Sequence, residues 1–212
     1  MKVPAPPSPI PTVKLVSLAK GTKLYRFFNL DYLPNAFNPC VGRPSRFAPL
    51  RGSAKDCVPT LYAGETKECA AFESVFRYVR VPKNKHGTVP FRGLENIGHA
   101  ELTLNRKLKL ACLYGPDQKA LGARDSVVTR AAPKHYAQTV KWAEAFHDQF
   151  KDIHGLVWTS YQCDPNSAYV FFGDRVAPSD FTHGPPTVVL ADATLLSEVH
   201  AFGLRARIIF IT

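Results

Sequence analysis

The sequence lacks the short motifs that would assign an enzyme class at once. Its 212 residues contain no G-x-G-x-x-G, no G-x-x-x-x-G-K-[ST], no H-E-x-x-H and no G-x-S-x-G. These absences disfavour a dinucleotide-binding α/β fold, a P-loop enzyme, a zinc protease and an α/β-hydrolase. No internal repeat is present either, so a solenoid or propeller is not indicated.

Cysteine and histidine show no metal-binding or disulfide pattern. No C-x-x-C pair occurs, the number of cysteines is odd, and the seven histidines are scattered without ligand spacing. We therefore expect no metal and no disulfide framework. Free cysteine packs as a small buried hydrophobe, which suits the apolar surroundings of Cys69 and Cys112. We expect reduced thiols, typical of a cytoplasmic protein, at Cys40, Cys57, Cys69, Cys112 and Cys163.

Long apolar runs are also missing, so no membrane span is expected. The start, MKVPAPPSPIPTVK, is too rich in proline to be the apolar region of a signal peptide. Proline imposes an extended backbone and removes hydrogen-bond donors. We expect residues 1–20 to form an arm over the surface and residues 21–212 to form a single domain.

Positive charge is what the sequence has in excess. The formal net charge is +10, while 45% of the residues are hydrophobic and 21% are charged, as in a globular protein with a full core. A basic balance favours anionic partners, which include nucleic acid, an acidic protein, a phosphorylated small molecule or a membrane surface. The same charge also serves solubility, so it does not choose among these partners.

Periodicity predicts an α+β fold with a mixed, mostly antiparallel sheet and a few helices. The order of elements is not a regular βαβ alternation. Apolar residues at helical spacing predict helices over 65–79, with Thr66 as N-cap, and over 134–151. Proline, glycine and polar residues predict loops over 35–52 and 81–98. Strands are expected at 23–29, 58–64, 100–113, 155–160, 168–172 and 204–212.

Two polar residues stand beside apolar stripes and need a partner. Glu73 lies in AAFESVF, where the simplest interpretation is an i,i+4 ion pair with Arg77 worth about 0.3–0.5 kcal/mol. Arg26 interrupts the aromatic strand LYRFF, where a charge requires a partner or a cavity. Taken singly, Tyr62 is interpreted as a core aromatic residue. Ser160 follows a strand, where a small hydroxyl usually belongs to a turn.

As a set, these residues suit an anionic dinucleotide. Arginines bind phosphate bidentately, and Arg46 adds a second one from the loop over 35–52. An aromatic ring offers a stacking face. A carboxylate binds ribose hydroxyls and stabilises positive charge on a sugar ring.

The ordered set resembles the RES-domain toxins of bacterial RES–Xre toxin–antitoxin pairs. The resemblance runs over residues 23–176. Arg43 lies three residues before Arg46 and is an alternative for the second arginine. The motifs that match are Arg26 in LYRFF, Arg46 in FNPCVGRPSRF, Tyr62 and Glu73 in PTLYAGETKECAAFESVF, and Ser160 in GLVWTSYQCDPNSAYVFFGDRV.

The resemblance implies a fold like that of ADP-ribosyltransferase toxins and an enzyme that consumes NAD as a substrate. Arg26 and Arg46 would hold the phosphates or ribose, and Tyr62 would orient the nicotinamide. Glu73 would stabilise the cationic ribose, and Ser160 would position the substrate. The acceptor would be water, phosphate or a protein side chain, which separates a glycohydrolase, a phosphorylase and an ADP-ribosyltransferase.

The same resemblance implies an antitoxin partner with an Xre-type helix-turn-helix domain, which would be the DNA-binding member of the pair. The alternative from another class is a basic, non-enzymatic nucleic-acid-binding module. That alternative predicts binding that weakens steeply with salt. Its sequence support is poor, because lysines and arginines are dispersed and no nucleic-acid-binding motif occurs.

Overall fold

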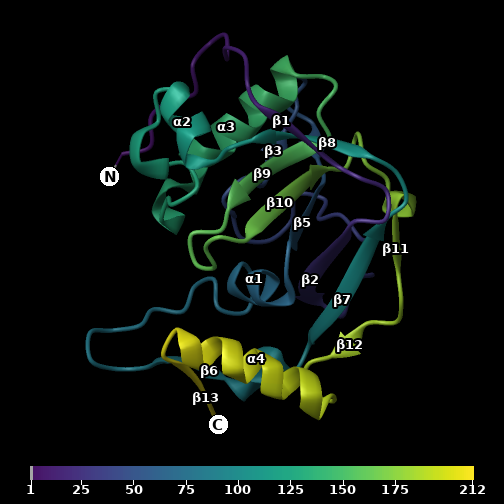
Figure 1. Cartoon of the computed structure of the whole chain (residues 1–212), viewed down its shortest axis with the longest axis vertical. Helices are drawn as coiled ribbons and strands as arrows, with labels where there is room; N and C mark the ends of the chain where they lie inside the picture. The colour runs from purple at the N-terminus through teal and green to yellow at the C-terminus, as the bar shows by residue number, and fades with distance from the viewer. Residues whose placement is uncertain (1) are drawn as a thin grey trace.

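A sheet of nine strands organises residues 2–212, the part of the chain that this computed structural model describes (Figure 1). The spatial order is β1-β8-β9-β10-β5-β2-β7-β11, and β12 pairs with the start of β7. Among these strands β8 and β9 run parallel, and the other pairs are antiparallel. The strands are β1 (Leu15–Leu18), β2 (Lys23–Asn29), β5 (Thr60–Gly64), β7 (Ile97–Leu104), β8 (Leu108–Cys112), β9 (Gly155–Thr159), β10 (Ser167–Phe172), β11 (Phe181–His183) and β12 (Thr187–Val188).

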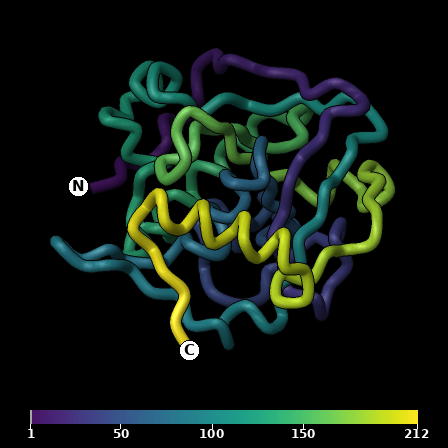
Figure 2. The backbone as a smooth tube through the Cα atoms, turned by 60° about the horizontal axis from the view of Figure 1, so that its bottom comes forward, coloured from purple at the N-terminus to yellow at the C-terminus, as the bar shows by residue number. Residues whose placement is uncertain are grey.

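Two small sheets and four α-helices complete the described residues. Helix α1 packs against β2, β5 and α4, while α4 runs across the front of the molecule beside the C-terminal strand (Figure 2). The small sheets pair β3 (Leu50–Arg51) with β4 (Cys57–Val58) and β6 (Gly87–Pro90) with β13 (Ile208–Ile211). The helices are α1 (Lys67–Phe72), α2 (Gly115–Ala120), α3 (Tyr136–Gln149) and α4 (Ala193–Arg205).

The sheet has an apolar cluster on each face, as period-2 alternation requires. Leu61 and Ala63 of β5 belong to one cluster, whereas Tyr62 packs against the other. The second cluster also receives Trp142 and Phe146 of α3, both fully buried. Burying one such side chain contributes about 1.5–3 kcal/mol. The predicted α+β class with a mostly antiparallel sheet is therefore confirmed.

Several predicted boundaries are wrong. The single strand expected over 100–113 is two strands, β7 and β8, joined by a turn. The loop expected over 81–98 contains β6 and a 3₁₀ turn, and the strand expected over 204–212 begins only at Ile208. Helices α2 and α4 were not predicted, although Asp192 caps α4 through a bond from the Leu195 N–H at 2.8 Å.

The proline-rich start is attached to the domain. Residues 15–18, expected as part of a surface arm, form the edge strand β1 and pair with β8. Before it, the Trp142 indole donates to the carbonyl of Pro4 at 2.8 Å, and the Ile10 N–H donates to Gln149 Oε1 at 2.7 Å. Val3 and Ile10 are buried, so short apolar anchors hold the segment against α3.

Candidate active site

A cavity opens where β2 and β5 separate. These neighbouring strands share one residue pair, Tyr25 with Gly64, and then diverge. The chain at residues 36–38 runs beside β5 instead, with Asn38 and Thr60 exchanging backbone hydrogen bonds of 2.8 and 3.1 Å. The cavity beside this segment has a volume of about 500 Å³, within the range of small-molecule sites.

The first turn of helix α1 packs closely against the last residue of β5. A Cβ atom on Gly64 would lie 2.6 Å from the Ala70 nitrogen, so only glycine permits this approach. Thr66 is the N-cap, as predicted, and accepts from the Cys69 N–H at 3.1 Å. Cys69, Ala70, Ala71 and Phe72 are buried, which fixes the helix on the sheet. The C-terminal end of α1 is thereby directed at the cavity.

The prediction that this helix continues to residue 79 is wrong. Helix α1 ends at Phe72, and the Phe76 N–H donates to the Ala71 carbonyl at 3.0 Å across a wider turn. The Ser74 hydroxyl donates to the Ala70 carbonyl at 2.5 Å, competing with the helical backbone bond. Glu73 and Arg77 therefore do not lie one above the other on a helix, and within residues 2–212 they form no ion pair.

Glu73 instead bonds to Ser160, which lies 87 residues later in the sequence. The Ser160 hydroxyl donates to Glu73 Oε1 at 2.7 Å, and Ser160 is fully buried just after β9. Pairing of β9 with β10 and of β10 with β5 carries Ser160 to the end of α1. Within residues 2–212, Glu73 Oε2 accepts no hydrogen bond, so it is available to a hydroxyl group of a ligand. A hydrogen bond to a carboxylate is charge-assisted and orients it firmly.

Tyr62 binds the loop that forms the opposite side of the cavity. Its hydroxyl accepts from the Phe47 N–H at 2.9 Å and shares a hydrogen bond of 3.0 Å with Ser45 Oγ. Its ring lies edge-on to Trp158 and lines the cavity. Burial raises the pKa of Tyr62, although the positive charge of Arg77 opposes the shift. The phenol is therefore neutral at physiological pH, and its hydroxyl is bonded to the loop while the residue lines the cavity.

The three arginines predicted as site residues differ in where they lie relative to the cavity. Arg26 lines the cavity, and its Nη1 donates to the carbonyls of Pro34 and Ala36, each at 2.8 Å. Burial lowers the pKa of Arg26 to about 10, which still leaves it charged. Arg43 also lines the cavity and is exposed.

Arg46 is buried behind the cavity and does not line it. Its Nη1 donates to the carbonyl of Ala131 at 3.2 Å, and its own carbonyl accepts from the hydroxyl of Thr139. Burial lowers the pKa of Arg46, and the carboxylate of Glu73 partly offsets this. Arg46 is therefore a buried cation behind the cavity and does not line it.

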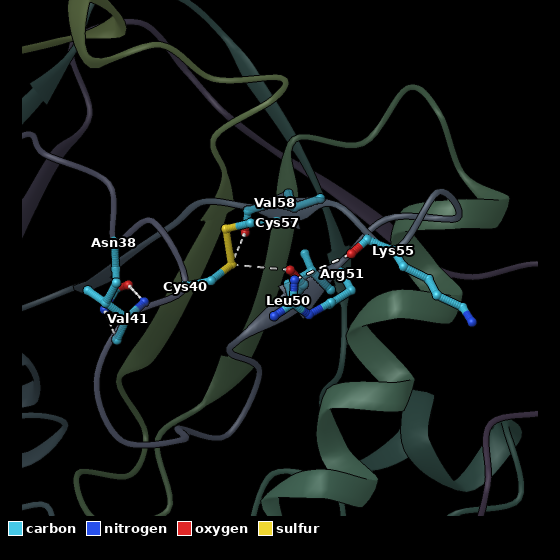
Figure 3. The surroundings of a disulfide bond; sticks show 8 residues. All are labelled: Asn38, Cys40, Val41, Leu50, Arg51, Lys55, Cys57 and Val58. Atoms are coloured by element: carbon cyan, nitrogen blue, oxygen red, sulfur yellow. Dashed lines mark hydrogen bonds between the residues drawn. A yellow bond between two sulfur atoms is a disulfide. The ribbon is translucent and has the colours of Figure 1, made fainter.

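A disulfide closes the loop that carries Arg43 and Arg46 (Figure 3). Cys40 and Cys57 are bonded across 17 residues, so the expectation of five reduced thiols is wrong for this pair. The remaining cysteines, Cys69, Cys112 and Cys163, are free and buried, and burial was predicted for Cys69 and Cys112. No local spacing marks this pair, because β3 and β4 bring Cys57 back to Cys40.

Sequence reasoning treated Arg77 only as a partner of Glu73 and missed its place in the cavity. The guanidinium of Arg77 lies over the rings of Tyr62, Tyr78 and Tyr136, at 5.8, 5.5 and 5.4 Å from their centroids. An available signal was the adjacent aromatic residue in the segment FRYVR, because arginine stacks on aromatic faces.

The charges around the cavity favour an anionic ligand. Three arginines line it, namely Arg26, Arg43 and Arg77, against a single carboxylate, Glu73. A carboxylate in such surroundings is suited to positive charge on part of the ligand. Within residues 2–212, no three histidine, cysteine, aspartate or glutamate side chains gather as a metal site would require.

Comparison with known proteins places the chain in a family. The model of the RES domain matches residues 23–189, from the start of β2 to just beyond β12. The chain belongs to the RES domain family. This confirms the family inferred from the ordered arginine, tyrosine, glutamate and serine motifs. No curated protein sequence matches the chain.

A solved structure supports the architecture. The chain is similar to one in the crystal structure of the M. tuberculosis MbcT–MbcA toxin–antitoxin complex, with a TM-score of 0.57 and 14% identity. The similarity covers 87% of this chain and 92% of the other. At this identity the likeness concerns the fold. In the part of the chain described here, no helix has both the length and the apolar character to cross a bilayer.

Proposed function

We propose that this RES-domain chain is the toxin of a toxin–antitoxin pair and that it cleaves the bond between nicotinamide and ribose in NAD. The observation that carries the proposal is the carboxylate of Glu73, oriented by Ser160 at 2.7 Å, in a cavity whose other charged lining residues are three arginines. NAD carries a diphosphate and a positively charged nicotinamide, so it complements both kinds of group.

Cleavage requires stabilisation of a developing cation. The bond between ribose C1′ and the nicotinamide nitrogen breaks, and its electron pair leaves with nicotinamide, which becomes neutral. The ribose ring then carries positive charge until an acceptor forms the new bond and loses a proton. Glu73 stabilises this charge directly or through the ribose hydroxyls at Oε2, while Ser160 holds Oε1 in place.

The remaining residues bind and orient the substrate. Arg26 and Arg43 line the cavity as cations, and the ring of Tyr62 offers a surface for the nicotinamide or the adenine. Arg46 lies buried behind the cavity, where its positive charge interacts with the carboxylate of Glu73. Water, phosphate or a protein side chain then accepts the ADP-ribosyl group.

An antitoxin is the expected macromolecular partner. The structurally similar chain belongs to a toxin–antitoxin complex, and the RES motifs resemble those of pairs whose antitoxin carries an Xre-type helix-turn-helix domain. The net charge of +10 favours an acidic binding surface on that partner. We propose that the antitoxin covers the cavity.

Product analysis tests the enzymatic proposal. The purified protein is incubated with NAD alone, with inorganic phosphate, and with cell lysate, and every product is identified by mass. Free ADP-ribose, its phosphate ester and a modified protein have distinct masses, so each acceptor is recognised. Nicotinamide release is expected in at least one condition, and its absence in all three would contradict the proposal.

A further inference from the structure

Arg77 is a cation without a counter-ion in the cavity. Within residues 2–212, no carboxylate lies within ion-pairing distance of it. Its Nη2 donates to the hydroxyl of Tyr136 at 3.4 Å, which is a long bond, and its Nε is buried with no partner. A partly buried charge with unsatisfied donors is costly unless another group binds it.

Aromatic rings fix the position of this guanidinium. The three tyrosines around Arg77 are Tyr62 from β5, Tyr78 from the same turn and Tyr136 at the start of α3. Burial disfavours the charge, but these tyrosines outweigh it and leave the pKa of Arg77 raised. The side chain is therefore charged and pre-organised, which lowers the entropy cost of binding an anion.

The other arginines are less suited to the same task. Arg26 uses Nη1 for the carbonyls of Pro34 and Ala36, which tethers the loop, and Arg46 does not line the cavity. Arg43 lies exposed at the surface, where solvent screens its charge. Arg77 is thus the partly buried, cavity-lining guanidinium that bonds to no carbonyl or carboxylate of the described residues.

We propose that Arg77 binds the diphosphate of the substrate and makes the cavity selective for nucleotides that carry one. This inference rests on the proposed function and assigns part of it to a residue outside the matched motifs. The planar fork of a guanidinium fits two phosphate oxygens at once, which a lysine does not reproduce. Ligands that lack phosphate gain nothing from this contact.

Binding of two ligands tests the proposal. ADP-ribose carries the diphosphate, whereas nicotinamide riboside lacks phosphate. Loss of a charged hydrogen-bonding partner should make Arg77→Gln bind ADP-ribose about tenfold or more weakly. The same variant should bind nicotinamide riboside within about twofold of the wild type, and Arg77→Lys should be intermediate for ADP-ribose. Arg80→Gln, at an exposed residue that does not line the cavity, is the matched control.

Kinetics separates binding from damage to the fold. For Arg77→Gln we expect KM for NAD to rise about tenfold, with kcat within about threefold of the wild type. Unchanged ADP-ribose affinity in Arg77→Gln overturns the proposal. If Arg77→Gln and Arg77→Lys both lose affinity for ADP-ribose and for nicotinamide riboside to the same extent, the proposal is also overturned. That result would mean that Arg77 has a structural role.

The proposed cleavage of NAD and the proposed diphosphate site can be refuted independently of each other. A wild-type protein that binds ADP-ribose through Arg77 but releases no nicotinamide would leave the diphosphate site standing and remove the enzymatic step. A wild-type protein that binds neither ADP-ribose nor NAD would remove both.

Discussion

Two of the walls of the cavity are built in different ways. One, which we call the β5–α1 wall, is formed by residues 60–78, with Ser160 behind Glu73; the other, the loop wall, is formed by residues 36–49. Residues 26–29 and Tyr32 complete the lining. Five residue pairs with β10 and the capped helix α1 fix the β5–α1 wall. The loop wall has only isolated bridges, at Asn38 and Ser45, and depends on side-chain tethers.

Those tethers include three besides the bonds of Arg46 to Ala131 and Thr139. The hydroxyl of Tyr62 bonds to Ser45 and Phe47, Nη1 of Arg26 bonds to the carbonyls of residues 34 and 36, and the disulfide joins Cys40 to β4. A wall fixed by sheet pairing holds reacting groups precisely, whereas a tethered wall sets the shape of the binding space. Changes to Glu73 or Ser160, which hold the reacting groups on the β5–α1 wall, should therefore lower kcat. Changes that release the loop wall should raise KM or lower stability.

Glu73→Gln should have the largest effect. The amide keeps the size of the side chain but removes the negative charge that stabilises the cationic ribose. We expect nicotinamide release to fall about 1,000-fold or more, comparable to or larger than the loss of one transition-state hydrogen bond. Single-turnover nicotinamide release measures it, with Glu95→Gln at an exposed residue outside the cavity as control. Substantial retained activity would contradict the role of Glu73.

Loss of the disulfide should mainly affect stability. Replacing Cys40 and Cys57 by serine removes a cross-link between residues 17 apart, which corresponds to about 3 kcal/mol in the chain-entropy model. Urea unfolding measures the change. A reductant should destabilise the wild type and leave the double variant unchanged. A fall in kcat with unaltered unfolding free energy would mean that the disulfide positions the reacting groups. The loop wall would then not differ from the β5–α1 wall in the way proposed.

The sequence predicted the β5–α1 wall better than the loop wall. Strand β2 was predicted with its observed ends, and Thr66 was predicted as the N-cap of α1. Glu73 and Ser160 were both predicted as site residues, but the hydrogen bond between them was not. The end of α1 was not predicted, because the buried Phe76 continues the helical period through a turn.

The disulfide and the position of Arg77 could not be read from local pattern. The Cys40–Cys57 bond depends on the pairing of β3 with β4, and the spacing of the cysteines in the sequence does not predict that pairing. Arg77 is placed by a turn in which Ser74 bonds back to Ala70, and its aromatic contacts come from three separate segments. Tertiary structure overrides the i,i+4 expectation there.

Ser160→Ala should reduce kcat by about 10- to 100-fold, because a charge-assisted hydrogen bond contributes about 1.5–3 kcal/mol. The buried hydroxyl holds Oε1 of Glu73, and without it the carboxylate samples other rotamers. KM for NAD should change little. Ser179→Ala, at an exposed serine, is the control. A rise in KM with constant kcat would place Ser160 in binding instead of in the orientation of Glu73.

Tyr62→Phe should have the smallest effect and be the most informative about the loop wall. The ring remains, but the Phe47 N–H and the Ser45 hydroxyl lose their partner, at a cost of about 1–2 kcal/mol in unfolding free energy. Since only the tether is lost, KM for NAD should rise about three- to tenfold with kcat nearly constant. Tyr161→Phe, at an exposed tyrosine outside the cavity, is the control. A loss of kcat as large as that of Ser160→Ala would mean that the loop wall also holds the reacting groups, because only a displaced Glu73 or ribose would slow the chemical step while binding persists.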